Sequence, residues 1–188
     1  IVHQACKLNK IGMTGLLYHL KGKSDTEPKV LMAHYDVVPI EEAGWDKPAF
    51  EGILEDGFLW GRGTLDTKGT LCGVLESVEA LLASGFVPEN DLYFAFSGGE
   101  EVNGKGAVNI VDYFADNNIP VALVVDEGGA VVENVFPGVK EPCGLIGIAE
   151  KGMVNLTLSV DSNGGHASAP KPHTPVGILS RACCAVIT

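Results

Sequence analysis

The sequence is poor in basic residues: 13 Lys and Arg stand against 24 Asp and Glu, which gives a formal net charge of −11. Proteins that bind nucleic acids or anionic lipid surfaces without reading a sequence do so mainly through Lys and Arg. A chain with this excess of negative charge is repelled by both. We therefore expect neither nucleic acid nor a membrane among the partners of this protein.

The sequence also lacks long apolar runs and cysteine pairs. No uninterrupted apolar stretch approaches the roughly 20 residues that span a bilayer, and the first ten residues, IVHQACKLNK, lack the apolar centre of a signal peptide. The five cysteines include no C-x-x-C spacing and are odd in number, which argues against a disulfide framework. These absences predict a protein of a reducing compartment, the cytoplasm.

The composition that is present is that of a globular protein. Hydrophobic residues make up 46% and charged residues 20%, which excludes disordered, collagenous and coiled-coil classes. A length of 188 residues suits one large domain, or one domain and part of a second. The chain begins in the middle of a pattern and stops at Thr188 within an apolar helical stretch, so we expect a fragment.

Strands and helices alternate over the first 150 residues. Apolar runs predict strands, and apolar residues at helical spacing predict helices between them. The predicted strands cover 15–22, 28–39, 58–60, 91–98 and 119–129, and the predicted helices cover 71–82 and 104–118. This order predicts an α/β fold with a largely parallel sheet and helices on both faces. In such folds ligands bind at the carboxyl ends of the strands.

The pattern changes after residue 150. Apolar and polar residues alternate over 153–161, which predicts a strand with one solvated face. A loop rich in Gly, Ser and Pro follows, and then a helix that opens with Thr174 as its cap and Pro175 at its first position. We therefore predict two domains, residues 1–149 and the beginning of a smaller α+β domain at 150–188.

Polar clusters follow several of the predicted strands. They are His34 to Asp36, Asp66, Glu100 with Glu101, and Asp126 with Glu127. Carboxyl ends of parallel strands share one edge of a sheet, so we expect these groups to meet. A histidine with several carboxylates and no cysteine is a ligand set for divalent ions, and so many carboxylates favour two ions. Without a cation, the carboxylates would repel one another.

Spacing within two clusters adds detail. His34 and Asp36 lie two residues apart, so in a strand both side chains point to the same side and the carboxylate can orient the imidazole. Glu100 and Glu101 are adjacent and point in different directions. One of them can therefore bind a metal while the other acts as a general base towards water.

Five motifs carry a family resemblance. The strings LMAHYDVVP, LWGRGTLDTKG, FAFSGGEEVNGKGA, VVDEGG and SNGGHASAP occur in this order over nearly the whole chain. They resemble the zinc-dependent M20 metallopeptidase family, nearest its carboxypeptidase S and N-acyl amino acid hydrolase branch. The resemblance implies that His34 binds one zinc, Asp66 bridges two zinc ions, and Glu101 binds the other. It makes Glu100 the general base and Asp36 the residue that holds His34.

The resemblance also bears on later residues. The ligand after the strand at 119–129 is Asp126 by its register, with Glu127 in reserve because members of the family differ there. His166, in the GGHASAP motif, would stabilise the oxyanion, often across a dimer formed by a lid domain. The peptide bond after Asp66 is cis in relatives.

The activity that the resemblance implies is hydrolysis of an amide bond in a small dipeptide or N-acyl amino acid with a free carboxylate. Zinc is the expected metal, although manganese or cobalt could occupy so oxygen-rich a site. Relatives add a distal histidine ligand after the lid that this chain lacks, so we expect the chain alone to be feeble or inactive. Two alternatives stay open: a non-catalytic remnant that binds or dimerises, and a deacylase of an amino-acid biosynthetic intermediate.

Overall fold

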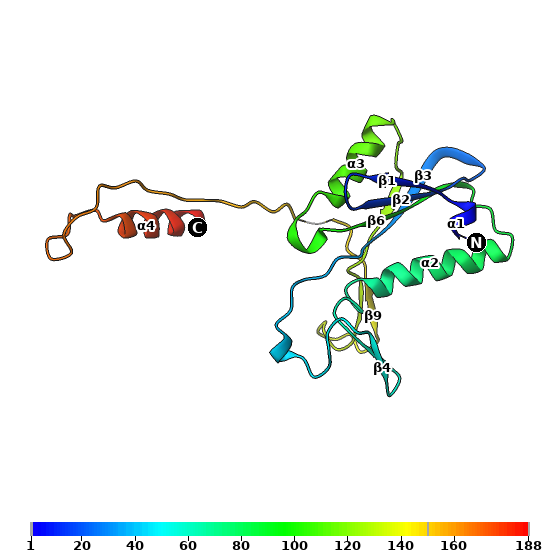
Figure 1. Ribbon diagram of the computed structural model, residues 1–188, viewed down its shortest axis with the longest axis horizontal. Coiled ribbons are helices and arrows are strands. Elements are labelled where there is room, and N and C mark those ends of the chain that lie inside the picture. Colours follow the sequence, from blue (N-terminus) through cyan, green and yellow to red (C-terminus); the bar gives the residue numbers. More distant parts are fainter. Residues whose placement is uncertain (1, 150, 188) are drawn as a thin grey trace. The chain divides into compact units, whose positions relative to one another are not determined.

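The computed structural model describes residues 2–149 and 151–187 and divides the chain into two units, residues 1–145 and 146–188 (Figure 1). The sequence predicts the division at residue 150. Each unit has its own contacts and is described by itself. None of the helices in the described part of the chain combines the length and apolar character needed to cross a membrane.

The first unit is built on a five-stranded sheet with the strand order β1-β2-β6-β3-β7. The strands are β1 Lys7–Ile11, β2 Gly15–Leu20, β3 Ser24–His34, β6 Asn90–Ser97 and β7 Leu123–Val125. The strands β6, β3 and β7 run parallel to one another, while β2 is antiparallel to both of its neighbours, β1 and β6. The parallel centre with its helices confirms the predicted α/β class.

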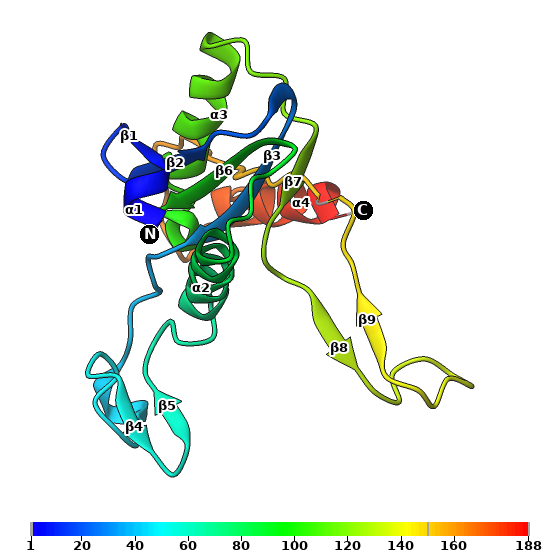
Figure 2. The same cartoon turned by 90° about the vertical axis from the view of Figure 1, so that its right-hand side faces the viewer.

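Helices cover both faces of this sheet, as predicted (Figures 1 and 2). Alternation along β6 sends Phe94 and Phe96 into a core beneath α2, Lys68–Ala83, where they pack with Val78. Tyr93 and Ala95, which alternate with them, point to the other face, under α3, Gly106–Asp116. Burial of a side chain such as Phe94 stabilises the fold by about 1.5–3 kcal/mol. The short helix α1, Val2–Ala5, joins the α2 side.

Two small antiparallel hairpins extend from the first unit (Figure 2). One pairs β4, Ile53–Glu55, with β5, Phe58–Trp60, across Asp56 and Gly57, which both have positive φ as a two-residue hairpin turn requires. The other pairs β8, Ala130–Val132, with β9, Cys143–Leu145. All four strands are only three residues long, and the sequence predicts β5 but not β4, β8 or β9.

The second unit contains α4, Pro175–Ile187. The Thr174 hydroxyl accepts a hydrogen bond from the N–H of Gly177 at 3.2 Å, which confirms the predicted cap. The strand predicted over 153–161 is not formed. A strand needs a neighbour for its backbone groups, and no strand pairs with this segment among the residues that the structure describes. Its apolar residues, such as Val154 and Leu156, are exposed.

Candidate metal centre

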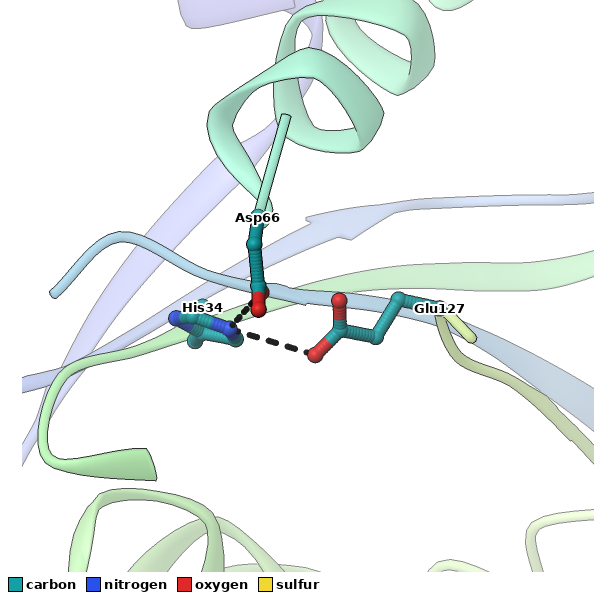
Figure 3. Close-up of side chains that lie close together, drawn as sticks. All are labelled: His34, Asp66 and Glu127. Carbon is teal, nitrogen blue, oxygen red and sulfur yellow. Dashed lines mark hydrogen bonds and ion pairs between the residues drawn. The ribbon is translucent and has the colours of Figure 1, made fainter. Parts of the chain in front are cut away.

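The candidate site lies at the carboxyl edge of the parallel strands, as the α/β pattern predicts. His34 is the last residue of β3 and is buried, with 3% of its surface exposed. Glu127 follows β7, the parallel neighbour of β3, and Asp66 precedes α2 by two residues. Figure 3 shows the Asp66 and Glu127 side chains pointing towards the His34 ring from these separate segments.

Two carboxylates converge on one nitrogen atom of the histidine. His34 Nε2 lies 3.0 Å from Asp66 Oδ1 and 3.2 Å from Glu127 Oε1, and the three atoms lie within 4.8 Å of one another. A ring nitrogen carries at most one proton, so it cannot satisfy both carboxylates fully. One imidazole nitrogen and two carboxylate oxygens around a common point fit a divalent cation such as zinc.

Asp36 ties the histidine to the loop that carries the two glutamates. Its Oδ1 lies 3.4 Å from His34 Nδ1, and its two oxygens accept the backbone N–H groups of Glu100 and Glu101, each at 3.2 Å. The His34 Nδ1 also lies 3.2 Å from the Asp36 backbone oxygen. A carboxylate on the far nitrogen of a metal-binding histidine orients the ring, and here it also fixes the neighbouring loop.

Glu100 reaches towards the cluster from the short helix η2, Glu100–Val102. Its Oε2 lies 3.8 Å from His34 Nε2, and its side chain is 55% exposed. Burial is the main cause that raises the pKa of Glu100; His34 lowers it, the carboxylates of Glu101, Glu127 and Asp36 raise it, and the net pKa lies above the ordinary value. A carboxylate with a raised pKa binds a proton more readily, which is what a general base requires.

The acidic surroundings also act on His34. Burial lowers the pKa of His34, but the hydrogen bond with Asp66 and the charges of Glu127 and Glu100 raise it by more. The net pKa is therefore above the ordinary value, so without a cation the ring binds a proton more readily. A positive charge at this nitrogen is stabilised by its surroundings.

Among the described residues, the three-residue cluster includes neither Glu101 nor Asp126. Glu101 is held through its backbone, and Asp126 is exposed just beyond β7. Strand register favours Asp126 as the ligand, whereas the structure places Glu127 beside His34. The reason is that β7 ends at Val125, so strand alternation no longer applies. Gly128, with φ of 93°, marks the turn that could have signalled this in the sequence.

His166 belongs to the second unit. Its Nδ1 lies 2.8 Å from the Ser168 hydroxyl oxygen, and the Ser168 N–H points to the same atom at 3.3 Å. The role of His166 towards an oxyanion stays a prediction, because each unit is described by itself. The peptide bond between Asp66 and Thr67 is cis, as the resemblance predicts.

Comparisons with known proteins bear on the whole chain. Residues 30–187 match the family described as Peptidase family M20/M25/M40. The chain is 43% identical over 186 residues to a probable carboxypeptidase S-like 2 of Dictyostelium discoideum, covering 96% of this chain and 36% of that protein. It is 39% identical over 167 residues to the human N-fatty-acyl-amino acid synthase/hydrolase PM20D1, covering 88% and 33%. The chain thus spans about a third of the length of these curated relatives.

Carboxypeptidase S of Saccharomyces cerevisiae is 36% identical over 193 residues, covering 95% of this chain and 32% of that protein. Among solved structures, an M20 family metallo-carboxypeptidase, Sso-CP2 from Sulfolobus solfataricus, is 25% identical with a TM-score of 0.56, covering 69% of this chain and 30% of that one. Human carnosine dipeptidase 1 has a TM-score of 0.58 at 20% identity, covering 67% and 30%, and shares the fold.

Proposed function

This chain belongs to the M20 peptidase family, and from that premise we propose that the protein hydrolyses an amide bond in a small dipeptide or N-acyl amino acid bearing a free carboxylate. The observation that carries the proposal is the convergence of Asp66 and Glu127 on His34 Nε2. The substrate class is supported by relatives named carboxypeptidase S and N-fatty-acyl-amino acid synthase/hydrolase.

The proposed cofactor is a pair of zinc ions, with manganese or cobalt as substitutes. His34, Asp66 and Glu127 would hold one ion, and Asp66 and Glu101 would contribute to the other. When bound, the metal supplies a Lewis acid that polarises the scissile carbonyl and makes water easier to deprotonate. The cluster of His34, Asp66 and Glu127 offers one nitrogen and two oxygen ligands, which suit zinc, and it contains no cysteine.

The protein's own side chains divide the proton transfers between them. Glu100 accepts a proton from the attacking water and passes it to the leaving amine, for which its raised pKa is favourable. Asp36 keeps the His34 ring and the Glu100 backbone in a fixed relation. His166 donates a hydrogen bond to the oxyanion of the tetrahedral intermediate.

We also propose a role for the second unit and a cellular compartment for the protein. The second unit, residues 146–188, begins a lid that supports a homodimer. The protein works in the cytoplasm, where its five cysteines stay reduced. The chain spans about a third of its relatives, so these statements concern the protein that carries it.

The test combines metal analysis with assays. The purified chain, and a longer protein that contains it, are measured for bound zinc by mass spectrometry before and after dialysis against a chelator. The longer protein is then assayed on dipeptides and N-acyl amino acids. We expect zinc to bind and hydrolysis to stop when it is removed and return when it is restored. Hydrolysis that continues without metal would overturn the proposal, and zinc binding without turnover would favour a binding role.

A further inference from the structure

Tyr35 lies within the candidate site but has no part in the proposed chemistry. Tyr35 separates His34 from Asp36, and its side chain packs with the core on the α2 face. Its backbone N–H donates to the Ser97 carbonyl at 2.9 Å, which extends the pairing of β3 with β6 by one residue. Tyr35 is therefore fixed against the point where β6 ends and the loop to Glu100 begins.

The hydroxyl of Tyr35 binds to Thr14, which is itself hydrogen-bonded to Gly98 at the start of that loop. We call the hydrogen-bonded pair of Thr14 and Gly98 the clasp. The Tyr35 hydroxyl donates to the Thr14 carbonyl at 2.8 Å. The same Thr14 carbonyl accepts the N–H of Gly98 at 3.2 Å, and the Thr14 hydroxyl donates to the Gly98 carbonyl at 2.9 Å. Both polar groups of the Gly98 backbone are thus held by Thr14, and Thr14 is held by Tyr35.

Close packing around Gly98 leaves little room for a side chain at this position. A Cβ atom on Gly98 would lie 3.1 Å from the ring and hydroxyl of Tyr35, and one on Gly106 would lie 2.3 Å from the Gly98 carbonyl oxygen. Gly98 therefore lies between the tyrosine ring and the first turn of α3. The Gly104 N–H donates back to the Gly99 carbonyl, which closes the loop on itself.

The loop 98–104 carries Glu100 and is held from two sides. Asp36 accepts its N–H groups at Glu100 and Glu101, while Thr14 and Tyr35 hold its beginning at Gly98. A displacement of about 1 Å in a reacting group can cost about a hundredfold in rate. Building on the proposed role of Glu100 as general base, we propose that Thr14 and Tyr35 are positioning residues for Glu100, acting through Gly98.

The test removes single hydroxyl groups and leaves the shapes in place. Tyr35→Phe deletes the donor to Thr14 but keeps the ring against Gly98, and Thr14→Val deletes the donor to Gly98. Tyr18→Phe is the matched control, because Tyr18 packs in the same core on the α2 face and its hydroxyl makes no hydrogen bond to the loop within the described residues. Thr14→Ser restores a hydroxyl and should rescue Thr14→Val.

The first readout needs no metal and no substrate. Amide hydrogen exchange in the purified 188-residue chain is followed at Gly98, Glu100 and Glu101. We expect Tyr35→Phe and Thr14→Val to speed exchange there by about tenfold through local opening, with α2 unchanged, and Tyr18→Phe to leave the loop as it is. Faster exchange spread equally over α2 and β6 would mean that the hydroxyls merely stabilise the fold, and it would overturn the proposal.

The second readout is the rate of the longer protein that contains the chain. Tyr35→Phe and Thr14→Val should lower kcat by about tenfold with KM and bound zinc unchanged, and Thr14→Ser should return kcat towards normal. If kcat stays normal in Tyr35→Phe and Thr14→Val while Glu100→Gln abolishes turnover, the positioning role is wrong and the base assignment stands. If Glu100→Gln turns over normally, the base assignment itself fails, whatever the exchange rates show.

Discussion

The sheet of the first unit carries a histidine–carboxylate group at each end, and the two differ in charge balance. At the amino end of β6, one buried carboxylate, Asp91, receives His19 Nε2 at 2.7 Å, Lys21 Nζ at 3.2 Å and the Gly22 N–H at 2.8 Å. At the carboxyl end of β3, one histidine, His34, faces four carboxylates at 3.0–3.8 Å.

The comparison separates a structural polar group from a site for a cation. Asp91 is satisfied by donors of the protein itself. Burial raises the pKa of Asp91, but the Gly22 N–H and the side chains of His19 and Lys21 together lower it by more. The pKa of Asp91 therefore lies below its usual value. At His34 the acidic groups outnumber the donors, and the pKa values of His34 and Glu100 are raised. Of the two groups, only the one around His34 has an excess of carboxylates that an added cation would balance.

The sharpest test neutralises one acid at each end of the sheet. Glu100→Gln removes the proton acceptor and should lower kcat of the longer protein by about 10²–10⁴-fold while zinc stays bound. Asp91→Asn should leave kcat almost unchanged. Steady-state kinetics with metal analysis decides the matter, and a comparable loss of kcat in both variants would erase the functional distinction between the two ends.

A second test compares zinc affinity of the purified chain. Glu127→Gln removes a proposed ligand and should weaken zinc binding by about a hundredfold, measured by competition with a coloured chelator. The control is His19→Asn, which changes the group at the opposite end of the sheet. Asp126→Asn discriminates between the two neighbouring acids: if it weakens binding more than Glu127→Gln does, the ligand is Asp126.

A third test concerns stability and pH. Asp91→Asn exchanges a charged acceptor of three donors for a neutral one and should lower the free energy of unfolding by about 2 kcal/mol at pH 7. Because the pKa of Asp91 is lowered on folding, its contribution is present above the unfolded value of about 3.9 and is lost as pH falls below it. Urea unfolding from pH 7 to pH 3 should therefore show a shallower acid decline in the variant; parallel curves for the two proteins would contradict this account.

The smallest effect is expected at Lys21. Its ammonium group contacts Asp91 at 3.2 Å, but its side chain is 64% exposed, so water screens the pair. Lys21→Gln should change the free energy of unfolding by less than about 1 kcal/mol. If Lys21→Gln lowers the free energy of unfolding as much as Asp91→Asn does, then Lys21, and not the Gly22 N–H or His19, provides most of the stabilisation of the Asp91 carboxylate.

The sequence predicts the centre of this fold better than its margins. The apolar runs of β3 and β6 identify strands that have packed side chains on both faces of the sheet, and the helical spacing of α2 identifies a helix whose inner side packs on that sheet. The edge strand β1 reads Lys-Leu-Asn-Lys-Ile and carries no comparable signal, because an edge strand meets water. The strand predicted over 153–161 fails for the opposite reason: its pattern is clear, but pairing depends on a partner strand.

The candidate site follows the same division. His34, Asp66 and Glu100 follow or precede elements that the sequence locates, so their approach to one edge is predictable. The choice between Asp126 and Glu127 depends on where β7 ends, to within a single residue. The hydrogen bonds of the clasp, between Thr14 and Gly98, join positions 84 residues apart, and on the Gly98 side they use only backbone atoms, which no side-chain pattern encodes.

The parallel pairing of β3 with β6, in which His34 lies opposite Ser97, fixes which face of the sheet the histidine side chain occupies. A slip of this pairing by one residue would turn His34 to the wrong face and carry the Glu100 loop out of reach, although the strands would remain just as apolar. The register of two buried strands, and not their apolar character, therefore brings the histidine and the carboxylates to one edge of the sheet.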